Sequence, residues 1–224
     1  MGIETPFTGA QGVSLSEALR ERTAAVHVTA ERSGIINDIL KQKAGRDGYA
    51  LLLRNVLPAY EALEAGLRDR GQNKVLSVFA QPGLARAQSI RNDLTQLVGE
   101  NFERSVPLLD AGKQYADRVA RAAEGDGMRL ISHAYVRYLG DLSGGQVLKK
   151  LLGKSMELPP QALTLYDFPD IPDHNAFKNE LRAAIDKAAD VVSDPEELIS
   201  EAVAAFQHNI AISTAVQDKV GSAS

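Results

Sequence analysis

Apolar residues recur every three or four positions through most of the chain, which is the spacing of amphipathic helices. The first such pattern covers residues 14–34 and predicts a helix. Ser14 and Glu17 have the spacing of an N-terminal capping box, and Gly34 stands where a left-handed residue commonly ends a helix. The periodic pattern and its end signals therefore agree.

A second helical pattern covers residues 47–71. Asp47 is placed to cap the start of this helix and Gly71 to end it, while Pro58 in its interior should kink or divide it. Further helices are predicted over residues 83–98, 112–124, 127–153, 173–192 and 194–216.

The same analysis finds no β-sheet, because no segment of useful length alternates apolar and polar residues with β-branched enrichment. We therefore expect an all-α fold. The chain has 224 residues, of which 44% are hydrophobic, so it can bury a sizeable core, and it shows no internal repeat or linker. We expect a single domain over residues 13–216, with flexible tails at 1–12 and 217–224.

Composition argues against several classes of protein. The formal net charge is −4 and aromatic residues make up 5% of the chain, whereas a nucleic-acid-binding domain usually has a basic excess and stacking aromatics. The absence of Cys excludes disulfides and thiolate sites and fits a reducing cytoplasm. No apolar run approaches the roughly 20 residues of a membrane span, and the N-terminus lacks a signal-peptide pattern. We expect a soluble cytoplasmic protein without a membrane anchor.

The stretch "YVRYLGDLSGGQVLKK" sets Gly140, Gly144 and Gly145 into a helical pattern, although each interior glycine costs about 1 kcal/mol relative to alanine. A phosphate-binding loop is excluded, because Gln146 follows the last glycine where Lys and then Ser or Thr are required. Gly140 and Gly144 lie four apart, on one helix face, and together expose the backbone to a neighbour. A flat, rigid ligand would suit that face; close helix packing or a helix break would also explain the glycines.

The four histidines lack the spacing of di-iron or zinc sites, because none follows an Asp or Glu by three residues and no H-E-x-x-H is present. His27 stands in the middle of the first predicted helix, with Glu31 one turn later. Arg20 falls near the same face, about 10 Å away along the axis. His27 is therefore either a ligand or an ordinary histidine satisfied by its surroundings.

Two segments carry a resemblance to a known family. "LRERTAAVHVTAE" around His27 and "HAYVRYLGDLSGGQVLKK" from His133 resemble the proximal and distal helix signatures of the haem oxygenase family, and the second match is long and specific. Weaker similarity extends to "LPAYEALE", "FPDIPDHNAFKNELRAAID" and "AFQHNIAI", in the family's order and over most of the chain. The resemblance implies a helical bundle that holds haem between a proximal and a distal helix, in a soluble, bacterial-type protein.

The resemblance assigns binding roles. It implies that His27 is the axial ligand of the iron of haem b, that Glu31 helps to orient it, and that Gly140 and Gly144 let the distal backbone approach the haem. Phe206 matches a residue of the pocket wall. The family's propionate-binding positions fall on Arg20, Tyr135, Lys178 and Arg182.

The resemblance also assigns the chemistry. It implies that Asp141 organises a water network that supplies a proton. Val136 stands where many relatives have Thr, so the water network is expected to differ locally. The positions that extend the hydrogen-bond network fall on Arg137, Tyr60 and Asn209.

The reaction implied by the resemblance is oxidation of haem at a meso carbon to biliverdin, CO and ferrous iron, with O₂ and several electrons. The chain has no flavin or nicotinamide motif, so we expect a separate donor, such as a ferredoxin or a flavin reductase. Lys149, Lys150 and Lys154 could meet an acidic donor or form an ordinary solvated face. The alternative function is a non-catalytic haem carrier or sensor, which would have no need of Asp141.

Overall fold

The computed structural model describes residues 12–222, and this part of the chain is helical and contains no strand. The all-α prediction is therefore confirmed. Short 3₁₀ helices occur at Leu76–Val78, Pro82–Leu84, Pro160–Ala162 and Thr164–Tyr166, and a π-helical turn, η3, spans Tyr135–Leu139. The α-helices are α1 (Leu15–Glu31), α2 (Gly34–Leu40), α3 (Arg46–Arg68), α4 (Ala87–Val98), α5 (Phe102–Ser105), α6 (Asp110–Ala122), α7 (Leu130–Ala134), α8 (Gly144–Ser155), α9 (His174–Ala188) and α10 (Pro195–Gly221).

The first predicted helix is confirmed as α1. The Ser14 hydroxyl accepts a hydrogen bond from the backbone N–H of Glu17 at 3.3 Å, which is one half of the predicted capping box; the Glu17 carboxylate pairs with Arg20 instead of the Ser14 N–H. Gly34 has φ +51°, the left-handed conformation predicted for it, and it starts α2 directly. The sequence pattern missed α2 as a separate helix.

Gly34 also makes a close contact with α10. A Cβ atom at Gly34 would lie 2.2 Å from the carbonyl carbon of Ser213. The Ser213 hydroxyl accepts from the N–H of Ile36 at 3.0 Å and donates to the carbonyl of Ser33 at 2.8 Å. The corner between α1 and α2 is therefore fastened to α10 by backbone contact and hydrogen bonds.

The second predicted helix is α3, but its predicted cap is wrong. The N-cap is Gly45, and Asp47 lies inside the first turn, where a carboxylate is favourable because of the helix dipole. α3 continues through Pro58 as one element, so the proline does not divide it. The helix ends at Arg68, before the predicted stop at Gly71.

The continuous helix predicted over residues 127–153 is wrong in one respect. The segment forms α7, η3 and α8, and it turns at Leu142 and Ser143, where Ser143 has the non-helical values φ −116° and ψ −86°. At the C-terminus, α10 continues to Gly221, beyond the predicted boundary at 216. Of the predicted tails, residues 1–11 and 223–224 lie outside the described part of the chain.

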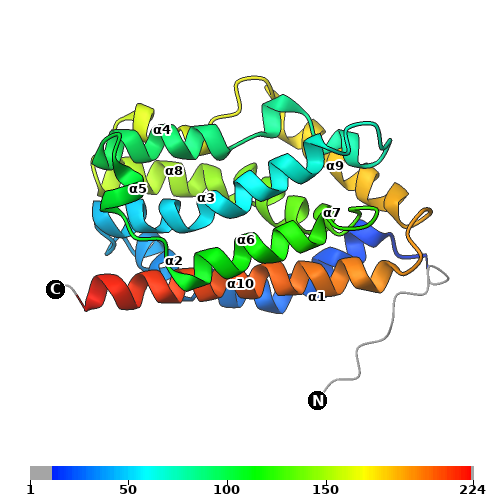
Figure 1. The fold of residues 1–224 in the computed structure, drawn as a ribbon, viewed down its shortest axis with the longest axis horizontal. Helices are drawn as coiled ribbons and strands as arrows, with labels where there is room; N and C mark the ends of the chain where they lie inside the picture. Colours follow the sequence, from blue (N-terminus) through cyan, green and yellow to red (C-terminus); the bar gives the residue numbers. More distant parts are fainter. Residues whose placement is uncertain (1–11, 223–224) are drawn as a thin grey trace, which may run out of the picture.

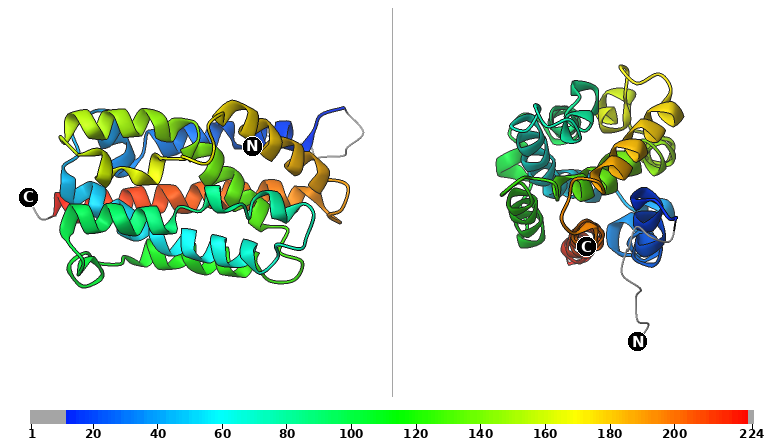
Figure 2. Two further views of the ribbon diagram at one scale, coloured as in Figure 1. Left: turned by 90° about the horizontal axis from the view of Figure 1, so that it is seen from above. Right: turned by 90° about the vertical axis from the view of Figure 1, so that its right-hand side faces the viewer.

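The helices form a bundle around α3 and α10. Figure 1 shows α10 along most of the molecule, with α1 and α6 beside it. Seen from above in Figure 2, α10 crosses between α1, in blue, and α6, in green. α3 packs against α4, α6 and α10. No helix within residues 12–222 is long and apolar enough to cross a membrane.

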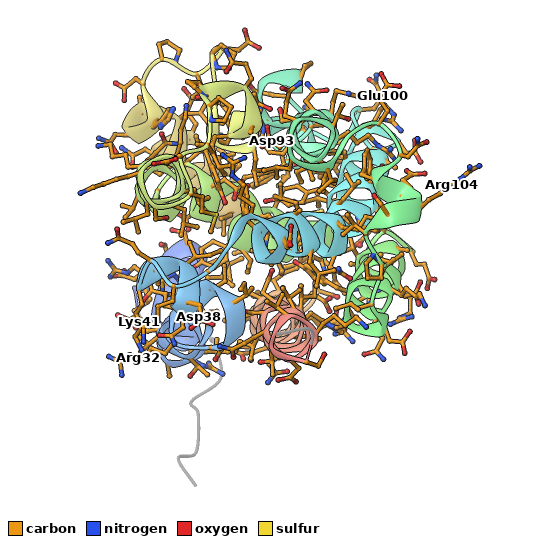
Figure 3. All side chains as sticks on the ribbon, turned by 90° about the vertical axis from the view of Figure 1, so that its left-hand side faces the viewer. Arg32, Asp38, Lys41, Asp93, Glu100 and Arg104 are labelled. Carbon is orange, nitrogen blue, oxygen red and sulfur yellow. The ribbon has the colours of Figure 1, made fainter. Side chains whose placement is uncertain are left out.

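Helix α3 contributes most to the core, because it is in contact with neighbours on several sides. Its buried side chains include Tyr49, Tyr60 and Leu63, each 0% exposed. Figure 3 shows α3 at the centre, with charged side chains such as Arg104 at the periphery. Asp93 is an exception: it points inward and accepts hydrogen bonds from the Thr164–Tyr166 turn.

A buried ion cluster joins α6, α7 and α10. His133 Nε2 lies 2.8 Å from Glu201 Oε1, and Arg118 donates to both carboxylate oxygens at 2.8 and 2.6 Å. Burial by itself would raise the pKa of Glu201, but the hydrogen bonds from His133 and Arg118 lower it to about 2. Glu201 therefore stays ionised in the folded protein.

We expect Glu201→Gln to lower the free energy of unfolding, and to lower it more near neutral pH than in acid. The folded-state pKa of about 2 lies below the ordinary value of about 4.3. The cluster therefore contributes stability above the ordinary value, and this contribution is lost as the pH falls toward the folded value. Urea unfolding followed by circular dichroism at several pH values measures the difference. The exposed Glu197→Gln is the control, and a pH-independent loss at Glu201 would contradict the assignment.

Candidate functional site

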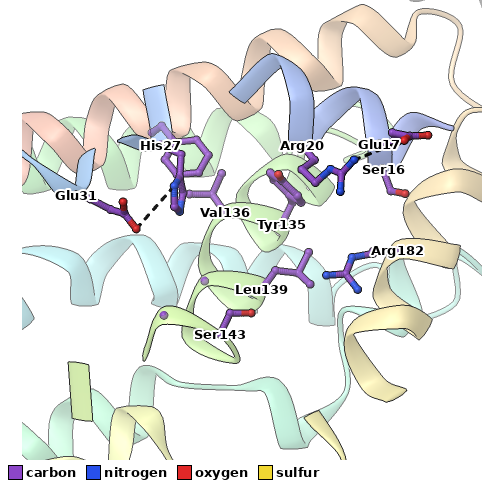
Figure 4. Close-up of a pocket in the computed structure, with 13 residues that line it drawn as sticks. Ser16, Glu17, Arg20, His27, Glu31, Tyr135, Val136, Leu139, Ser143 and Arg182 are labelled. Carbon is purple, nitrogen blue, oxygen red and sulfur yellow. Dashed lines mark hydrogen bonds and ion pairs between the residues drawn. The ribbon is translucent and has the colours of Figure 1, made fainter. Parts of the chain in front are cut away.

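An open pocket of about 480 Å³ lies between α1 and the segment that runs from η3 to α8 (Figure 4). A second cavity of about 310 Å³ continues from it toward α2 and α3, and the two share several wall residues. The shared residues are His27, Glu31, Val136, Gly140, Gly144 and Phe206. Both parts are open to solvent; the second, called the inner cavity below because it reaches toward α3, has the more apolar lining.

His27 lies on the α1 wall of this pocket. Its Nδ1 atom is 3.9 Å from Glu31 Oε1, and its ring meets Phe206 edge to face with centroids 5.4 Å apart. The side chain is 53% exposed. Among the described residues, neither ring nitrogen has a hydrogen-bond partner: Nδ1 faces the Glu31 carboxylate across 3.9 Å, and Nε2 is available.

The rim at one end of the pocket carries cations. Arg20 and Arg182 line the pocket, and Figure 4 shows them at the same end of it. Tyr135 of η3 also lines the pocket, with its hydroxyl 3.3 Å from Thr23 Oγ1. Burial raises the pKa of Tyr135, while the charges of Arg182 and Arg20 lower it in part, because both guanidinium groups are near. This end of the pocket suits a ligand with carboxylate groups.

Lys178, the fourth residue predicted for this rim, lies beside the pocket and not in its wall. Its Nζ atom donates to Ser143 Oγ at 3.2 Å, and Ser143 lines the pocket. Arg182 donates to Asn179 at 2.8 Å. The structure thus places Arg20, Tyr135 and Arg182 in the pocket wall, whereas Lys178 lies outside the wall and reaches it only through Ser143.

The three glycines of the wall facing His27 differ in what surrounds them. No atom lies within 4 Å of a Cβ built on Gly140 or Gly144, and both residues line the pocket. A Cβ on Gly145 would lie 2.7 Å from the ring of Tyr166. Gly140 and Gly144 therefore leave the pocket open, whereas Gly145 permits close packing.

The turn in this wall keeps both pocket glycines on the same side. Gly140 and Asp141 still continue the helix from η3, the chain turns at Leu142 and Ser143, and Gly144 starts α8. Gln146 then donates to the Tyr166 carbonyl at 2.9 Å and holds the start of α8 against the core. The wall facing His27 is thus made of backbone from two consecutive helices.

A buried hydrogen-bond network lies behind this wall. Tyr60 donates to Asp141 Oδ2 at 2.6 Å, and Arg137 donates to the Tyr60 hydroxyl at 2.7 Å. The other terminal nitrogen of Arg137 donates to Asn209 Oδ1 at 2.5 Å, and Asn209 donates to the Ala205 carbonyl at 2.8 Å. The four network residues named from the sequence are therefore in direct contact, although they come from α3, the η3–α8 segment and α10.

Asp141 as a whole residue is 7% exposed, and it lines the inner cavity. Burial raises its pKa above the ordinary value, and the charge of Arg137, the hydrogen bond from Tyr60 and the charge of Arg86 offset only part of this effect. A carboxyl group of this kind binds a proton more readily than an exposed one. It can therefore hold and release a proton at the edge of the cavity.

Sequence reasoning missed several lining residues. Ser16 and Glu17 lie one turn before Arg20 on α1, and Glu17 Oε1 is 3.5 Å from the Arg20 guanidinium. Leu139 and Ser143 lie beside the pocket glycines. Helical spacing from the predicted residues could have found the α1 pair, because residues three or four apart share a face.

Comparison with known proteins places these features in a family. A model of the family described as "Heme oxygenase" matches residues 13–215. A haem oxygenase 1 from Synechocystis sp. PCC 6803 is 36% identical over 198 residues, which are 88% of this chain and 82% of that protein. Human haem oxygenase 1 is 32% identical over 219 residues, which are 96% of this chain and 76% of that protein.

Solved structures that are similar in fold to this chain include haem oxygenases as well. The crystal structure of the Synechocystis haem oxygenase-1 in complex with haem is similar with a TM-score of 0.86 and 35% identity, covering 94% of this chain and 96% of that chain. A haem oxygenase from Leptospira interrogans has a TM-score of 0.84 and 33% identity, covering 91% of this chain and 100% of that chain. The fold and the sequence thus point to the same relatives.

Alanine substitutions at Gly145 and at Gly144 should affect the stability of the protein differently. We expect Gly145→Ala to lower the free energy of unfolding by about 1–3 kcal/mol, because the new methyl group would overlap the buried Tyr166 ring. Gly144→Ala should leave stability unchanged or raise it slightly, because nothing lies within 4 Å of its Cβ position. Urea unfolding of the two variants measures both effects. Equal losses would contradict the distinction between pocket and packing glycines.

The Tyr60 hydroxyl should control the proton affinity of Asp141. Tyr60→Phe removes a hydrogen bond that favours the ionised carboxylate, so the pKa of Asp141 should rise further. Carboxyl-labelled NMR titration of the aspartates follows that pKa. The control is Tyr135→Phe, because the Tyr135 hydroxyl contacts Thr23 and not the Asp141 network. An unchanged titration of Asp141 in Tyr60→Phe would refute this role of the hydroxyl.

Proposed function

The chain belongs to the haem oxygenase family and is a haem oxygenase, and we propose that the pocket between His27 and the Gly140–Gly144 wall is where it acts. The reaction opens haem at a meso carbon and yields biliverdin, CO and ferrous iron, with O₂ and electrons as co-reactants. Haem supplies the redox chemistry and is itself the substrate. The side chains of the pocket bind and orient the haem and move protons.

The residues of the pocket fit haem. A volume of about 480 Å³ is within the usual range for small-molecule sites of about 300–1,000 Å³. One wall offers an imidazole nitrogen, and the opposite wall has no side chain at Gly140 or Gly144. Cations stand at one end only, which suits a flat ligand that carries both carboxylates on one edge. This combination of walls is the observation that supports the proposal most strongly.

We assign the iron ligand to His27 Nε2. The carboxylate of Glu31 on the Nδ1 side favours the tautomer with its proton on Nδ1, which leaves Nε2 with a free lone pair. Phe206 contacts the ring edge to face and limits its rotation. Both neighbours therefore orient the imidazole toward the pocket.

We assign the propionate contacts to the cationic rim. Arg20 and Arg182 present guanidinium groups, which pair with carboxylates in a bidentate manner, and the Tyr135 hydroxyl lies close to both. Lys178 lies near enough to the rim, through its contact with Ser143, to add a further positive charge.

We assign proton handling to Asp141. Its Oδ2 atom accepts from Tyr60, so Oδ1 is the atom available to a water molecule in the inner cavity. Tyr60, Arg137 and Asn209 hold the carboxyl group in place, and burial raises its pKa. Val136 adds only an apolar surface to the pocket, so water must be ordered by this network instead. A haem carrier would have no need of a buried proton donor at this position.

The electron donor is a separate protein, and we propose that it meets the exposed lysines of α8. Lys149 forms an ion pair with Asp167, which reduces its availability. Lys150 and Lys154 are exposed. A ferredoxin or flavin reductase with an acidic surface would be attracted to these two charges.

A single-turnover assay with haem, O₂ and an electron donor tests the function. We expect wild type to convert haem to biliverdin with release of CO. Asp141→Ala should retain haem but lose about 100-fold or more in turnover rate, the usual contribution of a positioned proton donor. His27→Ala should lose the spectrum of the ligated iron, while His174→Ala, a histidine outside the pocket, should not.

Two results would count against these assignments. If wild type binds haem through His27 and leaves the porphyrin intact with every competent donor, the protein is a carrier or sensor. If Asp141→Ala turns over haem at the wild-type rate, proton handling lies elsewhere.

A further inference from the structure

A hydrogen bond joins the two helices that carry the cationic rim. The backbone N–H of Ser16, in the first turn of α1, donates to Oδ1 of Asp186 on α9 at 2.8 Å. The two residues are 170 positions apart in the sequence. The contact is partly buried, and Ser16 itself lines the pocket.

This hydrogen bond satisfies a donor that the helix cannot satisfy itself. The first N–H groups of an α-helix have no partner within the helix. The Ser14 hydroxyl takes the N–H of Glu17, and Asp186 takes that of Ser16. A carboxylate is also favoured at a helix N-terminus by the helix dipole. The α9 carboxylate is therefore well suited to hold the start of α1.

The hydrogen bond between Ser16 and Asp186 lies next to the rim residues on both helices. On α1, Arg20 comes one turn after Ser16; on α9, Arg182 comes one turn before Asp186. Figure 4 shows Ser16, Arg20 and Arg182 at the same end of the pocket. The spacing between the two guanidinium groups thus depends on how α1 and α9 are held together.

That spacing bears on where the haem edge comes to rest. An axial imidazole allows a planar ligand to rotate about the iron–nitrogen axis, so the rim contacts decide the rotation. Arg20 and His27 are separated by about 10 Å along α1, so a sideways shift of about 1 Å at the rim corresponds to a rotation of roughly 6°. The meso carbons lie a quarter turn apart, so a change of this size does not replace one by another; it turns the favoured meso carbon slightly away from the Gly140–Gly144 wall and brings its neighbour slightly closer.

We propose that Asp186 is a positioning residue that fixes the in-plane orientation of haem, and through it the ratio in which the meso carbons are opened, by holding α9 against the first turn of α1. The inference rests on the proposed function, because it assumes that haem occupies this pocket. Asp186 acts only through the rim residues and touches neither the iron ligand nor the Asp141 network.

The experiment compares changes on both sides of the hydrogen bond. Asp186→Ala removes the acceptor, and Ser16→Pro removes the donor at the second position of α1, where a backbone N–H has no partner within the helix. Asp186→Asn keeps a carbonyl oxygen that can accept the same N–H. Glu180→Ala is the matched control, since it removes an exposed carboxylate of α9 that does not line the pocket. Urea unfolding verifies that each variant is folded.

Two measurements are made on the haem complexes. Proton NMR of the ferric cyanide form gives the haem methyl shifts, which report the in-plane orientation without any turnover. Chromatography of the products gives the ratio of biliverdin isomers. We expect Asp186→Ala and Ser16→Pro to change the pattern of methyl shifts and to raise the share of minor isomers about threefold or more. Asp186→Asn and Glu180→Ala should match wild type.

The outcomes separate the two proposals. Unchanged methyl shifts in folded Asp186→Ala, or in Ser16→Pro if the first variant does not fold, would overturn the positioning role. A loss of stability without any change in the shifts would show that Asp186 is only a helix cap. If wild type forms no biliverdin, the proposed function fails, but the methyl shifts still decide whether Asp186 orients bound haem.

Discussion

The hydrogen bond from Tyr60 to Asp141 is the contact on which the arrangement of the pocket depends. It joins the most buried helix, α3, to the wall that faces His27, and at 2.6 Å it is short. Because the carboxyl group is buried, it needs donors and a nearby cation. Arg137 supplies the cation and, through Asn209, extends the network to α10. Three elements are thus aligned by the requirements of a single buried acid.

Much of the fold could be predicted from the sequence, because amphipathic helices repeat apolar residues every three or four positions. The start of α1 at Ser14 and the left-handed Gly34 are local signals, and both are confirmed. The predicted N-cap of α3 was wrong because Gly45 and Asp47, two residues apart, can both mark the start of a helix. A helix break near Ser143 was one of the explanations that the glycines left open, but the helical pattern could not select it, since the turn depends on packing of the next residues against Tyr166.

The site shows the same division between local and tertiary information. Spacing alone placed His27, Glu31 and Arg20 on one face, but it could not tell a ligand from a solvated histidine. Their roles came from family resemblance, and the structure adds that the predicted residues surround one pocket. The glycines needed the structure most. Clearance, close packing and a helix break were competing explanations, and each holds at a different point between Gly140 and Gly145.

Helix α1 is held at both of its ends. Asp186 holds its first turn, and Ser213 holds the corner where it meets α2 at Gly34. The exposed middle of α1, which carries His27, is therefore fixed in position by the contacts at its two ends. The helix of the opposite wall is interrupted at Leu142 and Ser143, with Asp141 tied to Tyr60 before the break and Gln146 tied to the Tyr166 carbonyl after it. If the pocket widens to admit haem or to release biliverdin, less strain is therefore expected from a change at the existing break in the wall than from bending α1.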